Sequence, residues 1–369
     1  MSIPFLDLGR QALEVEAEAA AAFARVLRRG VYVLGEEVAG FEEEWAAYCG
    51  ARACAGVGNG TEALSLALVA SGAVRPGQGD EVVTAPLTAA YTALAILNAG
   101  GVPAFADIDP ETYTLDPRAL EAAITPRTRA VVPVHLYGRP ADMEAITEVA
   151  RRHGLLVIED AAQAHGARLG GRRAGTLAAA AAFSFYPTKN LGALGDGGAV
   201  VSDDEALIER VKLLRQGGHA AALRGTAVGR NSRLDELQAA LLRVKLRRLD
   251  RWHEERQALS ALYRGALAGT RLQLPAPGGG QVHHLFVVGH PERDRLRDHL
   301  AARGVETAVH YPYLLHEQPL FRRPGQRALP AAERAAPHLL SLPLHPHLSP
   351  AEARLVIEAI LEFEGMAHG

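Results

Sequence analysis

The hydrophobic pattern of the chain alternates between short apolar runs and helical stretches over its N-terminal half. Apolar runs rich in β-branched and small residues occur at 53–57, 81–84, 102–107, 130–135, 155–160 and 198–202. Because these runs lack a polar face, they predict strands of a sheet that is covered on both sides. Helical patterns at 11–28, 63–68 and 88–97 separate or precede them. This alternation is typical of a mostly parallel sheet, which binds ligands at the carboxyl ends of its strands.

The pattern changes from about residue 204, where helices rich in Leu, Arg and Glu run to about 266. A stretch rich in proline and glycine at 270–280 indicates a linker or loop. A strand at 283–288, a helix at 293–303 and a last helix capped by Ser349 follow. We therefore predict an α/β protein with a large domain at 1–244 and a smaller C-terminal α/β domain at 245–369.

Composition narrows the class of protein. The 369 residues suggest two domains, and the net charge of −3 gives no electrostatic reason to expect nucleic acid or an anionic membrane as partner. The N-terminus lacks the features of a signal peptide, and no apolar run is long enough to span a bilayer. Two cysteines, Cys49 and Cys54, are too few for a disulfide framework. The predicted location is the reducing cytoplasm.

The fifteen histidines invite a metal interpretation. Their spacings do not form a helical pair accompanied by an acid, and cysteine ligands are missing. We therefore expect no metal site, and we expect these histidines in loops or interfaces.

Lys189 is the first candidate for chemistry. It follows an apolar run and a short polar loop, and a glycine-rich turn over 192–198 follows it. Such a loop can present one amine inside a pocket. An amine shielded from water shifts toward its neutral form and can then form a Schiff base. A lone lysine in a loop is more often a surface residue, so the interpretation depends on its neighbours.

Two further positions support a chemical role for Lys189. Asp160 ends a largely apolar strand, where it either caps the next turn or faces a cationic ligand atom, and we favour the ligand. Gly60 and Thr61 follow a strand and open a helix, which is a ready anion site but also an ordinary cap. Pyridoxal 5′-phosphate needs these three features together: donors for its phosphate, a carboxylate for its pyridine nitrogen and an amine for its aldehyde.

Longer motifs carry a family resemblance over nearly the whole chain. They are residues 30–35 (GVYVLG), 41–42 (FE), 60–63 (GTEA), 157–166 (VIEDAAQAHG), 183–192 (FSFYPTKNLG), 231–234 (NSRL) and 310–312 (HYP). With these motifs the chain resembles the sugar aminotransferases of the DegT/DnrJ/EryC1/StrS group. The resemblance implies the fold type I architecture of pyridoxal-phosphate enzymes.

The resemblance also implies roles for individual residues. Lys189 would bind the cofactor covalently, and Asp160 would pair with the pyridine nitrogen. Gln163 would contact the phenolic oxygen of the ring. The phosphate would be held by Gly60, Thr61 and Ser184, and by Asn231 of a neighbouring subunit, so that a homodimer shares its active site. His310, Tyr311 and Arg233 are weaker candidates for binding substrate.

One departure concerns the cofactor ring. The family commonly has a stacking aromatic just after the threonine that is Thr88 here, but this chain has Ala89, which cannot stack. Tyr91 is a candidate substitute. Relatives that use pyridoxamine phosphate for dehydration have histidine in place of the lysine, so Lys189 favours transamination.

The segment 186–198 looks closest to enzymes that aminate C3 of a nucleotide-linked 3-keto-6-deoxyhexose. The predicted reaction is transfer of an amino group from L-glutamate to a dTDP-linked 3-keto sugar. A 4-keto sugar, a UDP-linked 3-keto sugar and a keto-inositol remain alternative acceptors. A regulatory protein that binds pyridoxal phosphate without turnover is an alternative of another class. An oxidoreductase would need a Gly-x-Gly-x-x-Gly turn, and residues 56–61 (GVGNGT) lack the third glycine in register, because Thr61 stands at its position.

Overall fold

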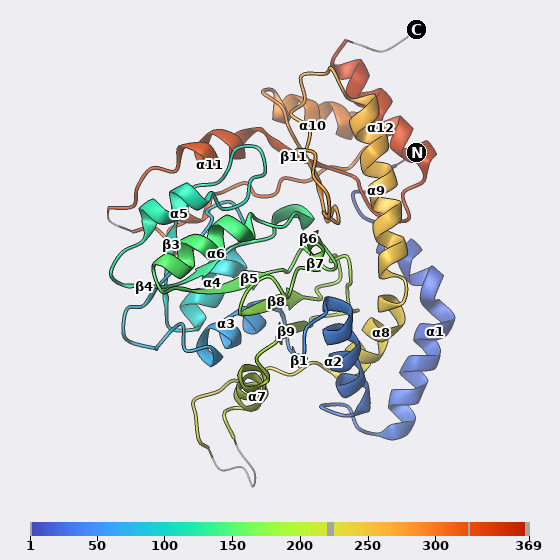
Figure 1. The fold of residues 1–369 in the computed structure, drawn as a ribbon. Coiled ribbons are helices and arrows are strands. Elements are labelled where there is room, and N and C mark those ends of the chain that lie inside the picture. Colours follow the sequence, from blue (N-terminus) through green and yellow to red (C-terminus); the bar gives the residue numbers. More distant parts are fainter. Residues whose placement is uncertain (1, 220–224, 324, 366–369) are drawn as a thin grey trace.

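A seven-stranded sheet forms the centre of the molecule (Figure 1). The structure is a computed structural model and describes residues 2–219, 225–323 and 325–365. The strands of the sheet, in spatial order, are β1 (Ala53–Val57), β9 (Gly198–Ser202), β8 (Ala180–Ser184), β5 (Leu156–Asp160), β4 (Thr128–Val132), β2 (Glu81–Thr84) and β3 (Val102–Phe105). Strand β9 runs antiparallel to both of its neighbours, and the other pairings are parallel. The prediction of a mostly parallel sheet is confirmed.

Helices cover both faces of this sheet, as the apolar runs predict (Figure 1). One face packs against α3 (Gly60–Ala70), α4 (Ala90–Asn98) and α7 (Glu205–Leu214). The other packs against α2 (Glu36–Cys49), α5 (Pro117–Ala123), α6 (Met143–Arg152) and α8 (Glu236–Leu246). Along β4, for example, Val132 belongs to the first core and its neighbour Val131 to the second. Because both faces of such a strand are buried, its sequence does not alternate between apolar and polar residues.

A separate apolar core, away from the seven-stranded sheet, lies toward the C-terminus. It is built from α9 (Leu249–Ala266), β10 (Phe286–Gly289), α10 (Arg293–Ala302), β11 (Leu339–Leu342) and α12 (Pro350–Phe363). Ile3 near the N-terminus also belongs to it and pairs with Val305. The predicted domain boundary at residue 244 falls inside α8, and the division into two domains stays a prediction.

The remaining elements are peripheral or connect the two cores. They are α1 (Leu8–Arg29), β6 (Arg168–Leu169), β7 (Arg172–Arg173), α11 (Pro330–Ala335) and the 3-10 helices Leu136–Gly138, Leu315–Glu317 and Ala336–His338. Helix α1 is close to its prediction: Asp7 caps its start, and Gly30 ends it in the left-handed conformation at φ 69°.

The predicted strand at 283–288 starts late, at Phe286. The carbonyl oxygens of His283 and His284 turn instead toward Arg256, which donates to them at 3.2 and 3.4 Å. Because those carbonyls satisfy a buried guanidinium, the residues do not join the sheet ladder.

His283 and His345 lie outside helices and strands, as the expectation of loop positions requires, whereas His253 lies within α9. His283 and His345 are buried near the buried Arg256, and neither ring nitrogen of His345 has a hydrogen-bond partner in the described part of the chain. Burial, with a contribution from nearby arginines, lowers the pKa of both imidazoles to about 4. The same effects lower the pKa of His253 to about 3. These imidazoles are therefore neutral in the folded protein at neutral pH.

Acid is expected to destabilise the protein through these histidines. In the unfolded chain they take up protons near pH 6.5, whereas in the folded protein they do so only near pH 4. The free energy of unfolding therefore falls as the pH drops from about 6.5 toward 4, by about 1.4 kcal/mol per pH unit for each such histidine. Urea titrations between pH 7 and 4.5 measure this slope. We expect His345→Leu to reduce the slope and the substitution of exposed His338 by glutamine to leave it unchanged; equal slopes in both variants would contradict the assignment.

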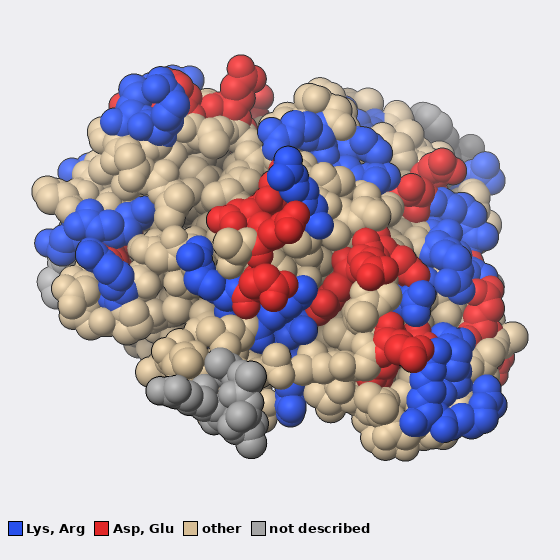
Figure 2. Space-filling model, turned by 60° about the horizontal axis from the view of Figure 1, so that its bottom comes forward, with Lys and Arg blue, Asp and Glu red and all other residues tan. Residues whose placement is uncertain are grey.

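The surface mixes charges of both signs. On the face shown in Figure 2, acidic and basic side chains interleave and leave no large area of one sign. Elsewhere in the structure, side chains of opposite sign form ion pairs, such as Arg247 with Glu18 at 2.9 Å. Among the helices of the described residues, none combines the length and the apolar character that crossing a membrane requires.

Candidate active site

Asp160 stands at the carboxyl end of β5, near the middle of the sheet. The residue is buried, with 8% of its surface exposed. One carboxylate oxygen accepts a hydrogen bond from the hydroxyl of Thr92 at 2.8 Å, and the other accepts from the backbone N–H of Ala162 at 3.2 Å. Thr92 lies in the first turn of α4, so the helix that follows β2 orients a carboxylate at the end of β5. The capping interpretation of Asp160 is therefore partly correct, since the carboxylate also caps its own turn.

Lys189 lies in the loop between β8 and β9 and is partly buried. Its backbone N–H donates to the carbonyl of Tyr186 at 2.8 Å, which closes a tight turn. A Cβ added at Gly192 would lie 2.3 Å from the carbonyl oxygen of Pro187, so the loop needs glycine there. Burial lowers the pKa of the Lys189 amine to about 8, although the nearby Asp160 carboxylate opposes this shift. A substantial fraction of the amine is therefore neutral near physiological pH.

The other two lysines of the chain are placed differently. Lys212 pairs with Glu209 on α7 at 2.9 Å. Lys245 is buried and donates to the carbonyl oxygen of Gly192 at 2.7 Å and to the side chain of Gln11 at 3.2 Å. Lys245 thus supports the turn that follows Lys189, and Lys189 is the lysine that adjoins Asp160.

The turn before α3 comes close to the end of β8. The side chain of Asn59 accepts from the N–H of Glu62 at 2.9 Å and caps α3. A Cβ at Gly60 would lie 2.6 Å from the Cβ of Ser184, so only glycine lets the helix start approach the strand this closely. The first N–H groups of a helix have no intrahelical acceptor. Gly60, Thr61 and the Ser184 hydroxyl therefore form a cradle with the chemistry of an anion site.

Gln163 joins the sheet to a loop from the C-terminal half. Its side-chain oxygen accepts from the backbone N–H of Tyr137 at 2.8 Å, and its side-chain nitrogen donates to the Tyr311 hydroxyl at 2.8 Å. Beside Tyr311, burial and the Lys189 charge lower the pKa of His310 to about 4. A hollow of about 470 Å³ adjoins Tyr311 and is also lined by Thr88 and Ala90. The structure thus gathers Lys189, Asp160, Gln163, Tyr311 and His310 at one edge of the sheet.

The family model described as the DegT/DnrJ/EryC1/StrS aminotransferase family matches residues 14–361. The chain belongs to this family. It is 49% identical over 366 residues to the dTDP-3-amino-3,4,6-trideoxy-alpha-D-glucose transaminase of Streptomyces venezuelae, covering 98% of this chain and 96% of that protein.

Solved structures agree with this assignment. A crystal structure of S. venezuelae DesV superposes with a TM-score of 0.95 at 48% identity and covers 98% of each chain. The structure of NtdA from Bacillus subtilis with the bound cofactor PMP has a TM-score of 0.91 at 32% identity and covers 99% of this chain and 85% of that one. The chain is thus a pyridoxal-phosphate-dependent aminotransferase, and the predicted fold type I architecture is confirmed.

Two of the sequence candidates of this aminotransferase line a different hollow from the one beside Tyr311. Asn231 and Arg233 are exposed and line a hollow of about 370 Å³ beside Asn59, at the start of α3. The side-chain hydrogen bonds of Asp160 in the described residues go to Thr92 and Ala162, not to Asn231 or Arg233. Their exposure leaves them available to a second subunit.

Reasoning from the sequence missed two residues of this site. Thr92 and Tyr137 contact Asp160 and Gln163 directly, but a threonine in a helix and a tyrosine after a strand carry no signal of that kind. Ala89 precedes α4 and offers no ring, as expected, and Tyr91 is 66% exposed in this chain. Tyr91 as the stacking residue stays a prediction.

Proposed function

We propose that this aminotransferase transfers an amino group from L-glutamate to C3 of a dTDP-linked 3-keto-6-deoxyhexose. The observation that carries the chemistry is the Lys189 amine, whose pKa burial lowers to about 8 beside the Asp160 carboxylate. The choice of acceptor is supported by the relative that is named a dTDP-3-amino-3,4,6-trideoxy-alpha-D-glucose transaminase and matches over the full length. The cytoplasm stays the predicted compartment.

The residues of the site fit pyridoxal phosphate. The cradle of Gly60, Thr61 and Ser184, which a Cβ at Gly60 would fill, suits the phosphate. Asp160 would face the pyridine nitrogen, and the side-chain nitrogen of Gln163 would face the phenolic oxygen, because its side-chain oxygen is already bonded to Tyr137. When bound, the cofactor supplies an electron-accepting ring that stabilises the charge left when a proton departs from the substrate.

The protein's own residues would handle the proton and the substrate. The Nζ atom of Lys189 would take the proton from the glutamate carbon that bears the nitrogen. In the second half of the reaction it would deliver a proton to the sugar carbon that receives the nitrogen. Its lowered pKa suits both tasks near neutral pH. His310 and Tyr311 would contact the sugar from the hollow beside Thr88, and Arg233 is the weaker candidate for a carboxylate or phosphate.

We also propose that the enzyme is a homodimer with shared active sites. Asn231 of each subunit would reach the cofactor phosphate of the other. This assignment is supported by the exposure of Asn231, which leaves its side chain accessible to a second subunit.

An absorbance spectrum of the purified protein tests the proposed function. We expect a visible band from the lysine-bound cofactor, which disappears when L-glutamate is added and returns when a suitable keto sugar is added. The dTDP-linked 3-keto sugar should restore the band faster than a 4-keto sugar, a UDP-linked 3-keto sugar or a keto-inositol. A band that ignores glutamate and all four acceptors would favour the regulatory alternative. No band even with added pyridoxal phosphate would refute the proposal.

A further inference from the structure

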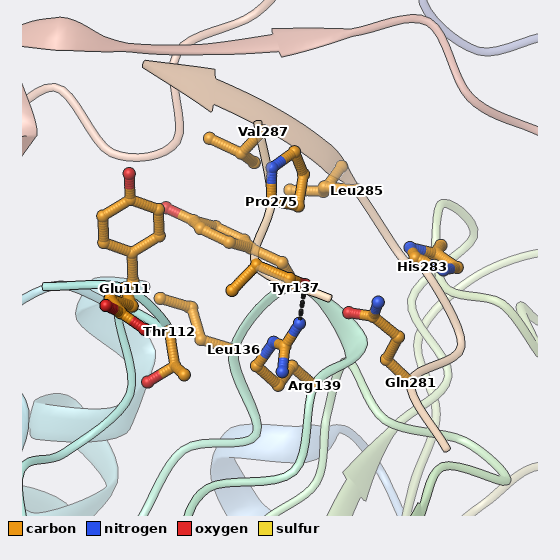
Figure 3. A pocket seen from close by; sticks show the side chains of 12 residues that line it. Glu111, Thr112, Leu136, Tyr137, Arg139, Pro275, Gln281, His283, Leu285 and Val287 are labelled. Atoms are coloured by element: carbon orange, nitrogen blue, oxygen red, sulfur yellow. Dashed lines mark hydrogen bonds between the residues drawn. The ribbon is translucent and has the colours of Figure 1, made fainter. Parts of the chain in front are cut away.

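A small cavity is lined by residues from the segments 111–113, 136–139 and 275–287 (Figure 3). Its volume of about 20 Å³ leaves room for about one water molecule, which is too small for a substrate or cofactor. The residues that line it are therefore the feature of interest. Tyr113, Tyr137 and His283 line it with φ angles of 61°, 57° and 45°. Left-handed backbone at a bulky residue costs about 1–3 kcal/mol and tends to gather at functional sites. Three such residues around one cavity therefore point to a function for this region.

Tyr137 connects this cavity to the active site through two hydrogen bonds. Its backbone N–H donates to the side-chain oxygen of Gln163 at 2.8 Å. Its hydroxyl donates to the backbone carbonyl oxygen of His310. The side chain is buried, and Figure 3 shows its ring between Leu136 and Val287. One residue thus holds both an amide that faces the proposed cofactor and the backbone of a loop that lines the substrate hollow.

A third hydrogen bond closes a ring of contacts. The side-chain nitrogen of Gln163 donates to the Tyr311 hydroxyl at 2.8 Å, and Tyr311 directly follows His310. Since that hydroxyl oxygen accepts from Gln163, its own proton is free for another partner. Tyr311 lines the hollow beside Thr88 and Ala90. Burial raises the pKa of Tyr311, so the hydroxyl stays protonated and acts as a donor.

We propose that Tyr137 is a positioning residue that holds the Tyr311 hydroxyl as a hydrogen-bond donor to an oxygen of the sugar substrate. This inference rests on the proposed function for the identity of the substrate, but the hydrogen-bonded ring itself does not. The Tyr137 hydroxyl acts through the backbone of the loop, and its N–H acts through Gln163. Both routes end at the same Tyr311 hydroxyl.

A double-mutant cycle tests this role. Tyr137→Phe removes only the bond to the His310 carbonyl, and we expect kcat/KM for the keto sugar to fall about 5- to 10-fold, mainly through KM. Tyr311→Phe should reduce it at least as much. If Tyr137 acts through Tyr311, the double variant should match Tyr311→Phe within about twofold. Two losses that multiply in the double variant would overturn the proposal.

Tyr113→Phe is the matched control. Tyr113 lines the same cavity, also has a left-handed backbone and packs edge-on against Tyr137 at 6.5 Å between ring centres. It takes no part in the ring of contacts that joins Tyr137, Gln163 and Tyr311. Removing the Tyr113 hydroxyl should leave kcat/KM within about twofold of the value for the unmodified enzyme. A loss equal to that of Tyr137→Phe would show a general effect of the cavity and overturn the proposal.

Hydrogen exchange of the substrate-free enzyme gives a readout that does not depend on turnover. Amides of residues 308–314 should exchange several-fold faster in Tyr137→Phe than in the unmodified enzyme or in Tyr113→Phe. Unchanged exchange in this segment would overturn the positioning role. If the unmodified enzyme aminates none of the keto sugars, the proposed function fails, and the exchange result still decides whether Tyr137 holds the loop.

Discussion

Replacing Lys189 with alanine is expected to lower aminotransferase turnover at least about a thousandfold and to abolish the visible band of the bound cofactor. Of the three lysines in the chain, Lys189 is the one beside Asp160 with an amine whose pKa burial lowers to about 8. Alanine removes both the covalent attachment of the cofactor and the base that moves the substrate proton. General acid–base catalysis alone is typically worth about 10²–10⁴ in rate. Absorbance spectra and single-turnover kinetics with L-glutamate measure both effects.

Two control variants sharpen this experiment. Lys189→Arg keeps a positive charge, but a guanidinium stays protonated and forms no Schiff base, so the same loss is expected. Lys212→Ala removes a half-buried lysine on α7 that pairs with Glu209, and it should leave spectrum and turnover unchanged. Retention of the visible band in Lys189→Ala would show that another lysine binds the cofactor. Retention of turnover would refute the proposed mechanism.

Asp160→Asn is expected to reduce kcat about 100- to 1,000-fold while the protein remains folded. Asparagine has nearly the same shape and can still accept the bond from Thr92 that now measures 2.8 Å. It cannot supply the negative charge that keeps a pyridine nitrogen protonated. Removing one preorganised electrostatic contact of this kind typically costs about 10²–10³ in kcat. Steady-state kinetics with saturating glutamate and keto sugar measure the loss.

Thr92→Val is the matched control for Asp160. It removes the hydroxyl that orients the carboxylate but leaves the charge, so a loss of about 3- to 10-fold is expected. The order of the two effects is the informative result. If Thr92→Val cost as much as Asp160→Asn, orientation rather than charge would be decisive. A loss below threefold in Asp160→Asn would remove Asp160 from the catalytic assignment.

The fold follows from the sequence to a large extent because the strands are buried on both faces. Runs such as 130–135 and 155–160 have no polar alternation, and only a sheet covered on both sides explains that pattern. The prediction was less accurate where a tertiary contact competes with local preference. His283 and His284 have the pattern of a strand, but their carbonyl oxygens bind the buried Arg256 instead. The spacing of residues along the chain contains no information about such a distant partner.

The sequence by itself determined the family, the central sheet and the residues whose chemistry is strong and local. A lysine before a glycine-rich turn, an aspartate that ends an apolar strand and a glycine at a helix start each stand out against their neighbours. The tertiary structure alone decided how these groups are oriented. Thr92 and Tyr137 touch Asp160 and Gln163 from elements 68 and 26 residues away. Orientation depends on hydrogen bonds between distant segments, and only the packed fold brings those segments within bonding distance.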